Sequence, residues 1–381
     1  MGRDALFAAL RDRRSGLSHC AFETVDLDTY VGQVPDAELV PLRDDLKNFE
    51  CRNNRLAQLG LRQDGFEQAV ARLRERYGAA RIGVFIGTST AGILQTELAY
   101  RRRDPNTGAL PADFRYEHTH NTFSPASFVQ RYLGLTGPAV AVSSACSSSA
   151  KVFGNAQRMI AAGLCDAAIV GGVDSLCLTT LYGFNSLQLV SKKPCRPFDA
   201  ERDGISIGEA AGFALLEKAG GPLGDDQLAL LGVGESCDAY HMSTPHPEGL
   251  GARMAMQGAL TQADLSTTDI DYINLHGTAT RSNDATEALA VNMIFGDRVP
   301  ASSTKGWIGH TLGAAGIMEA IISFIAVEES FIPGSLHTES IDPSVSIQYL
   351  KENRRGQVKR VLSNSFGFGG TNCSLIVGRA Q

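Results

Sequence analysis

The sequence predicts an α/β fold in which parallel strands dominate. Short apolar runs rich in β-branched residues alternate with longer segments whose apolar residues recur at helical spacing. The chain has 40 glycines and is only 7% aromatic, a composition that suits many junctions between strands and helices. Alternating strands and helices are typical of layered α/β proteins, which place their sites at the carboxyl ends of strands.

The first part of the chain begins with a helix and then follows this alternation. The elements that we expect are a helix at 1–17, irregular chain at 21–55, a helix at 56–78, a strand at 81–86, a surface excursion at 100–122, a helix at 123–133, a strand at 138–142, a helix at 150–163, a strand at 167–170, an apolar segment at 178–190 and a strand at 209–217. The strand at 167–170 is expected to stop at the two glycines that follow it.

The second part follows a glycine- and proline-rich stretch at 220–224, which is the best candidate for a linker. We therefore predict an N-terminal half at 1–220 and a C-terminal half at 221–381. The elements expected in the second half are strands at 228–234, 270–276, 299–303, 358–363 and 371–378, and helices at 251–263, 284–294 and 313–329.

Composition and charge exclude several classes of protein. The net charge of −6 argues against a nucleic-acid-binding protein. No apolar run is long enough to span a membrane, and no secretory signal peptide is recognisable. None of the eight cysteines forms a Cys-x-x-Cys pair, so we expect no zinc site and no other metal site. Scattered cysteines without a signal peptide predict reduced thiols in a cytoplasmic protein.

Cys146 lies among serines, between the strand expected at 138–142 and the helix expected at 150–163. A thiol at a helix start faces unpaired backbone N–H groups and the positive end of the helix dipole, and both lower its pKa. The neighbouring serines are expected to cap the helix. The alternative is an inert buried thiol, the usual state of a free cysteine. This stretch alone leaves both interpretations open.

Three motifs in the second half carry further candidates. NLHGTAT places His276 at the end of a strand, SSTKGWIGH carries Lys305 and His310, and FGFGGTN at 366–372 is a glycine-rich loop whose backbone has unusual freedom. A single histidine at such a position is more often structural than catalytic. Two histidines with a lysine and a cysteine favour a Cys–His site. We expect the other six histidines on the surface or in loops.

These motifs together resemble the β-ketoacyl-acyl-carrier-protein synthases of the elongating type, condensing enzymes of the thiolase superfamily. The resemblance covers nearly the whole chain, and its motifs are specific in this order and spacing. They are SACS at 144–147, RPFD at 196–199 with RDG at 202–204, NLHGTAT at 274–280, Lys305 with GH at 309–310, and NSFGFGGTN at 364–372. The resemblance implies a thiolase fold, a layered α-β-α-β-α arrangement of two similar halves.

The resemblance also implies a role for each principal candidate. Cys146 is the nucleophile that takes up an acyl group. Its backbone N–H forms the oxyanion hole with that of Phe368, whose ring gates entry of the second substrate. His276 and His310 hold a malonyl thioester and stabilise its enolate, so loss of His310 is expected to spare acyl transfer.

Supporting roles are implied for six more residues. Lys305 acts on the histidine pair, Glu319 and Glu287 are its electrostatic support, Thr278 and Thr280 bind the pantetheine arm, and Phe184 lines the acyl channel. For Phe184 and Phe368, plain core packing is the alternative interpretation.

The chain departs from the family in four places. It lacks the glycine-rich strand that usually precedes the first helix, so either the start is short or a sheet edge is left open. The loop at 192–195 is short, Gln188 stands where an arginine is common, and Ile205 and Ala210 replace a phenylalanine and a glycine. Carrier identity and pathway therefore stay open between bulk fatty-acid elongation and a polyketide or aryl-polyene pathway.

The expected partners are an acyl carrier protein, its acyl and malonyl thioesters, and a second copy in a homodimer or a chain-length factor in a heterodimer. No cofactor is expected beyond the phosphopantetheine of the carrier. Two alternatives are weighed. A non-catalytic subunit like a chain-length factor would lack Cys146, and a thiolase-like coenzyme A acyltransferase would carry a second cysteine where FGF at 366–368 stands.

Overall fold

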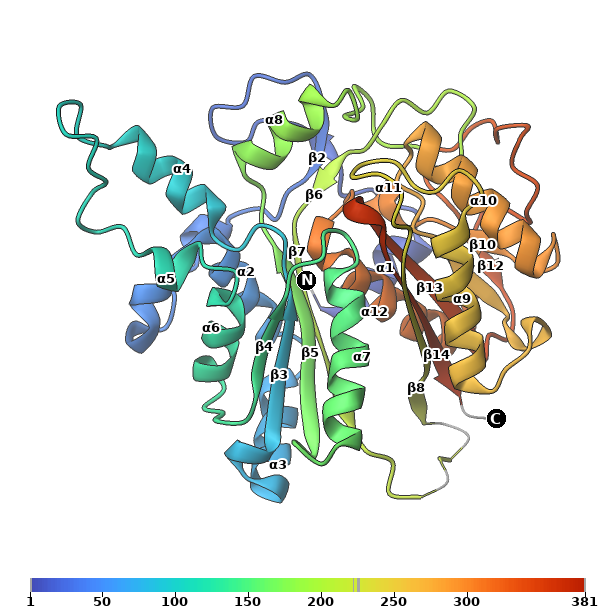
Figure 1. Cartoon of the computed structure of the whole chain (residues 1–381), viewed down its shortest axis with the longest axis horizontal. Coiled ribbons are helices and arrows are strands. Elements are labelled where there is room, and N and C mark those ends of the chain that lie inside the picture. The colour runs from blue at the N-terminus through green and yellow to red at the C-terminus, as the bar shows by residue number, and fades with distance from the viewer. Residues whose placement is uncertain (1, 222, 225–226, 380–381) are drawn as a thin grey trace.

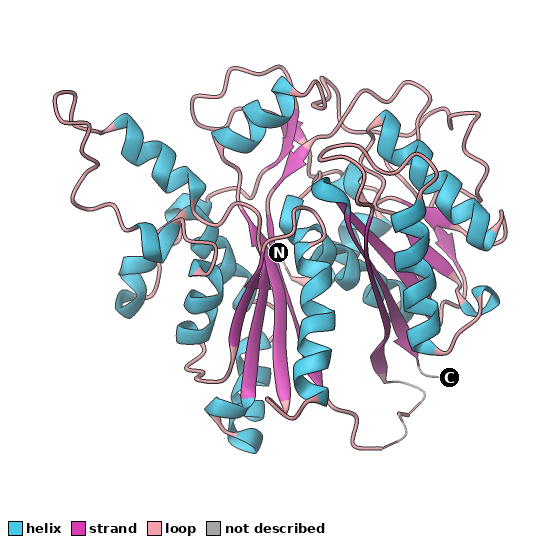
Figure 2. Cartoon of the chain, in the orientation of Figure 1, coloured by secondary structure: helices cyan, strands magenta, loops and turns pink. Residues whose placement is uncertain are grey.

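The computed structural model describes residues 2–221, 223–224 and 227–379 (Figure 1). Two sheets stand side by side, with helices between them and on their outer faces (Figure 2). The predicted α/β class is confirmed. Pro222, inside the predicted linker, lies outside the described residues.

The first sheet has the strand order β4-β3-β5-β7. Its strands are β3 (Ile82–Gly87), β4 (Ala139–Val142), β5 (Ala167–Asp174) and β7 (Ala210–Glu217). β4, β3 and β5 are parallel, whereas β7 is antiparallel to β5. Gly87 at the end of β3 lies beside Val142 on one side and Gly172 on the other, so the three parallel strands end together.

The second sheet has the strand order β10-β9-β13-β14-β8. Its strands are β8 (Leu228–Cys237), β9 (Tyr272–Asn274), β10 (Ala301–Ser302), β13 (Arg360–Gly367) and β14 (Thr371–Arg379). The first three in this order are parallel, and β14 and β8 are antiparallel to their neighbours. Both sheets are therefore mixed, and the predicted dominance of parallel strands is only partly right.

The two sheets share one topology over their first four strands. The second sheet adds β8 beside β14, whereas β7, the counterpart of β14, pairs with β5 alone among the described strands. Among the described strands, β7 is therefore one edge of the first sheet and β4 is the other.

Helices complete five layers around the sheets (Figure 1). The middle layer holds α7 (Ser148–Ala161) and α12 (Ala315–Glu328), which contact each other and strands of both sheets. A Cβ on Gly316 would lie only 2.5 Å from the backbone N of Ala150, so glycine permits this close helix contact. The outer faces are covered by α2 (Arg52–Leu61) and α6 (Ser124–Tyr132) on one side, and by α9 (Leu250–Ala263) and α10 (Arg281–Phe295) on the other.

Shorter elements complete the fold. Two small sheets are formed, in the orders β1-β2-β6 and β11-β12. The remaining helices and strands are α1 (Arg3–Arg11), β1 (Ser18–His19), β2 (Tyr30–Gly32), α3 (Phe66–Tyr77), α4 (Ile93–Arg101), α5 (Tyr116–Thr119), α8 (Leu178–Ser186), β6 (Ile207–Gly208), α11 (Lys305–Ile308), β11 (Phe331–Ile332) and β12 (Arg354–Arg355). Within the described residues, no helix is long and apolar enough to cross a membrane.

Several predicted boundaries are wrong for identifiable reasons. β5 continues through Gly171 and Gly172 to Asp174, because it is paired with a strand on each side there. Glycine at 172 serves packing instead of ending the strand, since a Cβ there would lie 2.5 Å from the side chain of Ser149 in α7. The helix expected at 56–78 is split in two, with Gly65 at a left-handed φ of 70° before α3. Irregular chain expected at 21–55 includes β2, whose short pairing with β6 leaves no periodic signal.

Candidate active site

Cys146 lies in the tight turn between β4 and α7, where the parallel strands of the first sheet end. Ala145 before it has a left-handed φ of 52°, which costs a residue with a Cβ about 1–2 kcal/mol. Ser148 Oγ accepts from the N–H of Ser144 at 2.9 Å and donates to the carbonyl of Ala145 at 2.5 Å, and Ser147 Oγ donates to the carbonyl of Ser144 at 2.8 Å. The serines therefore hold the turn. None caps α7, so the predicted capping is wrong.

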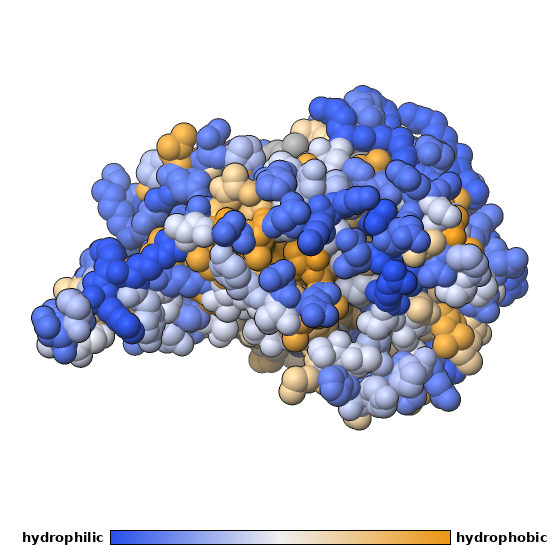
Figure 3. Space-filling view, turned by 90° about the horizontal axis from the view of Figure 1, so that it is seen from above, coloured by the Kyte–Doolittle hydropathy of each residue, from blue (hydrophilic) through white to orange (hydrophobic). Residues whose placement is uncertain are grey.

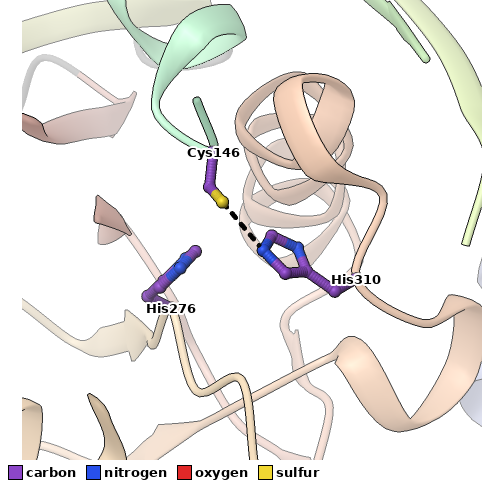
Figure 4. A group of neighbouring side chains, drawn as sticks. All are labelled: Cys146, His276 and His310. Atoms are coloured by element: carbon purple, nitrogen blue, oxygen red, sulfur yellow. Dashed lines mark hydrogen bonds between the residues drawn. The ribbon is translucent and has the colours of Figure 1, made fainter. Parts of the chain in front are cut away.

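His276 and His310 reach the thiol from the second half of the chain (Figure 4). His276 follows β9 and His310 follows α11, and their ring centroids are 5.3 Å apart at an angle of 84°. Nε2 of His310 lies 3.0 Å from Sγ of Cys146. All three side chains are buried. The backbone N–H of His310 donates to the carbonyl of Ser206 at 2.7 Å, which joins His310 to the first half.

The thiol and the imidazole are both neutral in this environment. Burial raises the pKa of the Cys146 thiol to about 12, although the positive charge of Lys305 and the N–H of Phe368 favour the thiolate. The predicted lowering of this pKa is therefore wrong, because desolvation outweighs the helix start. Burial, reinforced by Lys305, holds the pKa of His310 well below its ordinary value. The S–H of Cys146 therefore donates to a neutral Nε2.

Lys305 is buried behind the histidines and paired with Glu319. Its Nζ donates to Oε1 of Glu319 and to the backbone carbonyl of His276, and lies 3.4 Å from Nδ1 of His276. Glu319 also accepts from Ser365 Oγ at 3.3 Å. The same charge, after burial, lowers the pKa of His276 well below its ordinary value. Lys305 therefore acts on His276 from the protein interior, and Glu319 holds Lys305 in place.

Glu287 occupies a different position from the one implied by the resemblance. It accepts from the backbone N–H groups of His276 and Gly277, each at 2.8 Å, and from Nδ2 of Asn364 at 3.1 Å. Burial raises the pKa of its carboxyl to about 7. The recorded contacts of Glu287 do not include Lys305. Glu287 therefore fixes the backbone that carries His276 and does not pair with the lysine.

A pocket of about 70 Å³ unites most of the remaining candidates. Its lining includes all three reactive side chains together with Thr278, Thr280, Phe184 and Phe368. The hydroxyls of Thr278 and Thr280 lie 2.9 Å apart. Apolar side chains break the polar surface near the middle of the face seen from above (Figure 3). Binding of pantetheine by the threonines and of an acyl chain beside Phe184 stay predictions.

Phe368 lies at the start of a short 3₁₀ helix, Phe368–Gly370, between β13 and β14. Gly369 and Gly370 have left-handed φ values of 80° and 75°, which explains the need for glycine here. The backbone N–H of Phe368 donates to the sulfur of Cys146. This N–H faces the nucleophilic sulfur, whereas an oxyanion donor must face the oxygen of the acyl group. The oxyanion hole implied for Phe368 and Cys146 stays a prediction.

Sequence reasoning missed the contacts that hold this loop. Asn372 donates through Nδ2 to Oδ1 of Asp238 at 2.9 Å, and the N–H of Gly369 donates to the carbonyl of Met242 at 2.7 Å. Asn372 stands in a recognised motif, but Asp238 stands in a polar stretch without any pattern. Nothing in the sequence could have paired the two residues.

The three reactive side chains also form the group best able to hold a metal among the described residues. The ligand atoms of Cys146, His276 and His310 all lie within 4.8 Å of one another. Sulfur and imidazole nitrogen are ligands that zinc prefers. A bound ion would occupy the nucleophile, and the positive charge of Lys305 close to His276 opposes a cation. The absence of a metal from the working site stays a prediction.

Family models match most of the chain. The model described as "Beta-ketoacyl synthase, N-terminal domain" matches residues 56–220, and the one described as "Beta-ketoacyl synthase, C-terminal domain" matches residues 228–339. A 3-oxoacyl-[acyl-carrier-protein] synthase 2 of Rhizobium meliloti (strain 1021) is 41% identical over 313 residues, which cover 78% of this chain and 74% of the relative.

Solved structures are similar over the whole length. The ketosynthase ApeO of Xenorhabdus doucetiae, solved in complex with its chain length factor ApeC, has a TM-score of 0.88 and 38% identity, and the match covers 99% of this chain and 94% of that one. The ishigamide ketosynthase/chain length factor gives a TM-score of 0.89 at 26% identity, covering 100% and 95%. These likenesses confirm the thiolase-type fold. With a buried Cys–His–His group at the junction of two similar halves, this chain belongs to the β-ketoacyl synthase family, as a condensing enzyme of the 3-oxoacyl-[acyl-carrier-protein] synthase 2 type.

Proposed function

We propose that this acyltransferase extends an acyl chain held on Cys146 by condensing it with a malonyl thioester, both delivered on the phosphopantetheine arm of an acyl carrier protein. The observation that carries the proposal is the 3.0 Å contact between Sγ of Cys146 and Nε2 of His310 in the pocket that His276 also lines. No finding supports either alternative, a non-catalytic subunit or a coenzyme A acyltransferase.

Acyl transfer is the first step. Nε2 of His310 accepts the thiol proton as the sulfur of Cys146 bonds to the carbonyl carbon of the acyl thioester. The bond from that carbon to the pantetheine sulfur breaks, and the leaving sulfur takes the proton back from His310. The backbone N–H of Phe368 stabilises the negative charge on oxygen, and one such donor is worth about 3 kcal/mol in the transition state.

Condensation is the second step. The malonyl thioester oxygen is held by the Nε2–H of His276, and by His310 once the single proton of its neutral ring has shifted from Nδ1 to Nε2. Both rings are neutral because burial lowers the pKa of each well below its ordinary value. The bond to the carboxylate breaks and carbon dioxide leaves. The electron pair forms the new carbon–carbon bond to the acyl carbon, and the sulfur of Cys146 departs as a thiolate, which takes a proton from water to regenerate the neutral thiol. This chemistry uses side chains and N–H groups alone, so we propose no resident cofactor or metal.

The open edge of β4 supports assembly with a second subunit. β4 pairs with β3 on one side only among the described strands, and each residue of Ala139–Val142 is half-buried. An apolar edge strand of this kind pairs readily with another chain. We propose a homodimer through this edge. Pairing with a chain-length factor is the other outcome, because ApeO was solved with such a partner. Mass measurement in solution, alone and with a candidate factor, separates the two.

All eight cysteines are free thiols, and Cys237 is exposed. Free thiols persist in a reducing compartment, which supports a cytoplasmic location. The pathway, whether bulk fatty-acid elongation or a polyketide or aryl-polyene route, is decided by a screen of acyl chains on the cognate carrier with product lengths read by mass.

Intact mass spectrometry after incubation with an acyl-carrier substrate tests the nucleophile. The wild-type chain and a Cys237→Ser control should gain one acyl group, whereas Cys146→Ala should gain none. An adduct that persists on Cys146→Ala would refute the assignment. Release of carbon dioxide from malonyl carrier by the acylated wild type then tests the condensation step.

A further inference from the structure

Asp174, which has no part in the chemistry described so far, carries the most fully bonded carboxylate near the site. It is the last residue of β5, and its side chain is completely buried. Its two oxygens accept hydrogen bonds from both halves of the chain. The donors are the hydroxyls of Thr88 and Thr90 and the backbone N–H groups of Ser89, Thr90 and Gly313.

One of these donors leads to the nucleophile. The N–H of Ser89 donates to Oδ1 of Asp174 at 2.8 Å, and Oγ of Ser89 donates to the carbonyl of Ala145 at 3.2 Å. Ala145 precedes Cys146 and has the left-handed backbone described above. A strained residue keeps its conformation only where its surroundings hold it. Ser89, oriented by Asp174, is one of those restraints.

Another donor leads to the histidine. The N–H of Gly313 donates to Oδ2 of Asp174 at 2.5 Å, three residues after His310. A Cβ on Gly313 would lie 2.7 Å from that oxygen and 2.7 Å from Oγ of Ser89. Contacts this short are not tolerated, so glycine is required for the approach. Gly313, Ser89 and Asp174 are therefore in close mutual contact, and each fixes the position of the other two.

We propose that Asp174 is a positioning residue, which joins the segment before Cys146 to the segment after His310 and so sets the sulfur-to-nitrogen distance on which acyl transfer depends. The inference rests on the proposed function. Elements from both halves of the chain donate hydrogen bonds to this one buried carboxylate. Its other side-chain donors, Thr88 and Thr90, do not line the substrate pocket. A displacement of about 1 Å between reacting groups can slow a reaction roughly a hundredfold.

The charge of Asp174 adds a second, separable effect. The negative charges of Asp174 and Glu319 disfavour the Cys146 thiolate, whereas the charge of Lys305 and the N–H of Phe368 favour it. Burial raises the pKa of Asp174 itself, and the hydrogen bonds from Thr88, Ser89 and Thr90 oppose that rise by stabilising the charged carboxylate. Loss of the charge at 174 therefore eases ionisation of Cys146 while loss of the hydrogen bonds misplaces it. Alkylation of Cys146 should therefore occur at lower pH while acyl transfer becomes slower. A general loosening of the fold does not produce this combination.

The test compares Asp174→Asn with wild type in two assays, acyl transfer from an acyl carrier followed by intact mass, and alkylation of Cys146 by iodoacetamide between pH 6 and 10. We expect acyl transfer to fall roughly tenfold to a hundredfold and the alkylation profile to move to lower pH. Asp166→Asn is the matched control, because that carboxylate lies just before the other end of β5, on the surface, in a pair with Arg81. It should match wild type in both assays.

Normal acyl transfer by a folded Asp174→Asn would overturn the inference, as would slower transfer with an unmoved alkylation profile. If that variant does not fold, Ser89→Ala decides the matter, because it removes only the link to Ala145 and should slow acyl transfer severalfold without lowering the melting temperature by more than a few degrees. An unchanged rate in Ser89→Ala would then refute the proposal. Failure of the wild type itself to take up acyl groups would instead refute the proposed function.

Discussion

The rings of Phe184 and Phe368 pack against each other with their centroids 5.6 Å apart and their planes inclined by 47°. Phe184 belongs to α8 in the first half, and Phe368 belongs to the glycine-rich loop in the second. The backbone N–H of Phe368 also meets the sulfur of Cys146. The position of α8 therefore affects access to the nucleophile through this ring contact. Substitution of either phenylalanine should change the behaviour of the implied gate.

Removing the Phe184 ring should loosen this gate. We expect Phe184→Ala to raise the rate of Cys146 alkylation by iodoacetamide severalfold at pH 7, because Phe368 loses its packing partner and the thiol gains access to water. Tyr182→Ala is the control, since Tyr182 lies on the same helix but is 39% exposed. Intact mass spectrometry measures the alkylation rates. Equal rates in wild type and Phe184→Ala would show that the ring contact does not restrain the loop.

The protonation state of Cys146 predicts an unusual pH profile. With a thiol pKa raised to about 12 by burial, only a small fraction is thiolate at neutral pH. The alkylation rate should therefore climb by about tenfold per pH unit from pH 7 to 10 without levelling off. A plateau below pH 8 would instead reveal a preformed ion pair between thiolate and His310. Initial rates of adduct formation on the Cys237→Ser background make the measurement.

The two histidines should differ in the first step. Of the two histidines, His310 is the one hydrogen-bonded to the sulfur. We therefore expect His310→Ala to slow acyl transfer by about 10²–10⁴-fold, the usual contribution of a general base. His276→Ala should leave acyl transfer within severalfold of wild type and abolish release of carbon dioxide from malonyl carrier. This revises the expectation from the resemblance that loss of His310 spares acyl transfer. Similar rates of acyl transfer in the two variants would restore the original expectation.

Much of the fold and most of the pocket could be predicted from the sequence, because the motifs that carry Cys146, His276 and His310 follow strand or helix ends. What could not be predicted depends on contacts between distant segments. Asp174 and Asp238 carry no local signal, and their partners lie in other elements. The pKa of Cys146 was misjudged for the same reason. A helix start is visible in sequence, but the depth at which the second half buries it is not.

Replacing only one member of the buried ion pair of Lys305 and Glu319 should strongly lower the free energy of unfolding. Lys305→Met leaves the carboxylate of Glu319 buried without its cation, so the free energy of unfolding should fall by about 3–5 kcal/mol at pH 8. Burial already raises the pKa of Glu319, and Lys305 is what opposes that rise. A folded-state pKa above the unfolded value means that stability is lost as pH rises, so Lys305→Met should be relatively more stable at pH 5 than at pH 8.

The double variant Lys305→Met with Glu319→Gln separates the charge from the packing. It should recover a large part of the lost stability in urea unfolding, because no unpaired charge remains in the interior. The double variant should also lack the greater relative stability at pH 5 that is expected of the single variant, because the carboxyl of Glu319 is gone. Condensation should nevertheless stay impaired in both variants, since His276 loses the neighbouring cation that lowers its pKa. A double variant as unstable as Lys305→Met would show that the lysine stem packs the core and that the ion pair contributes little.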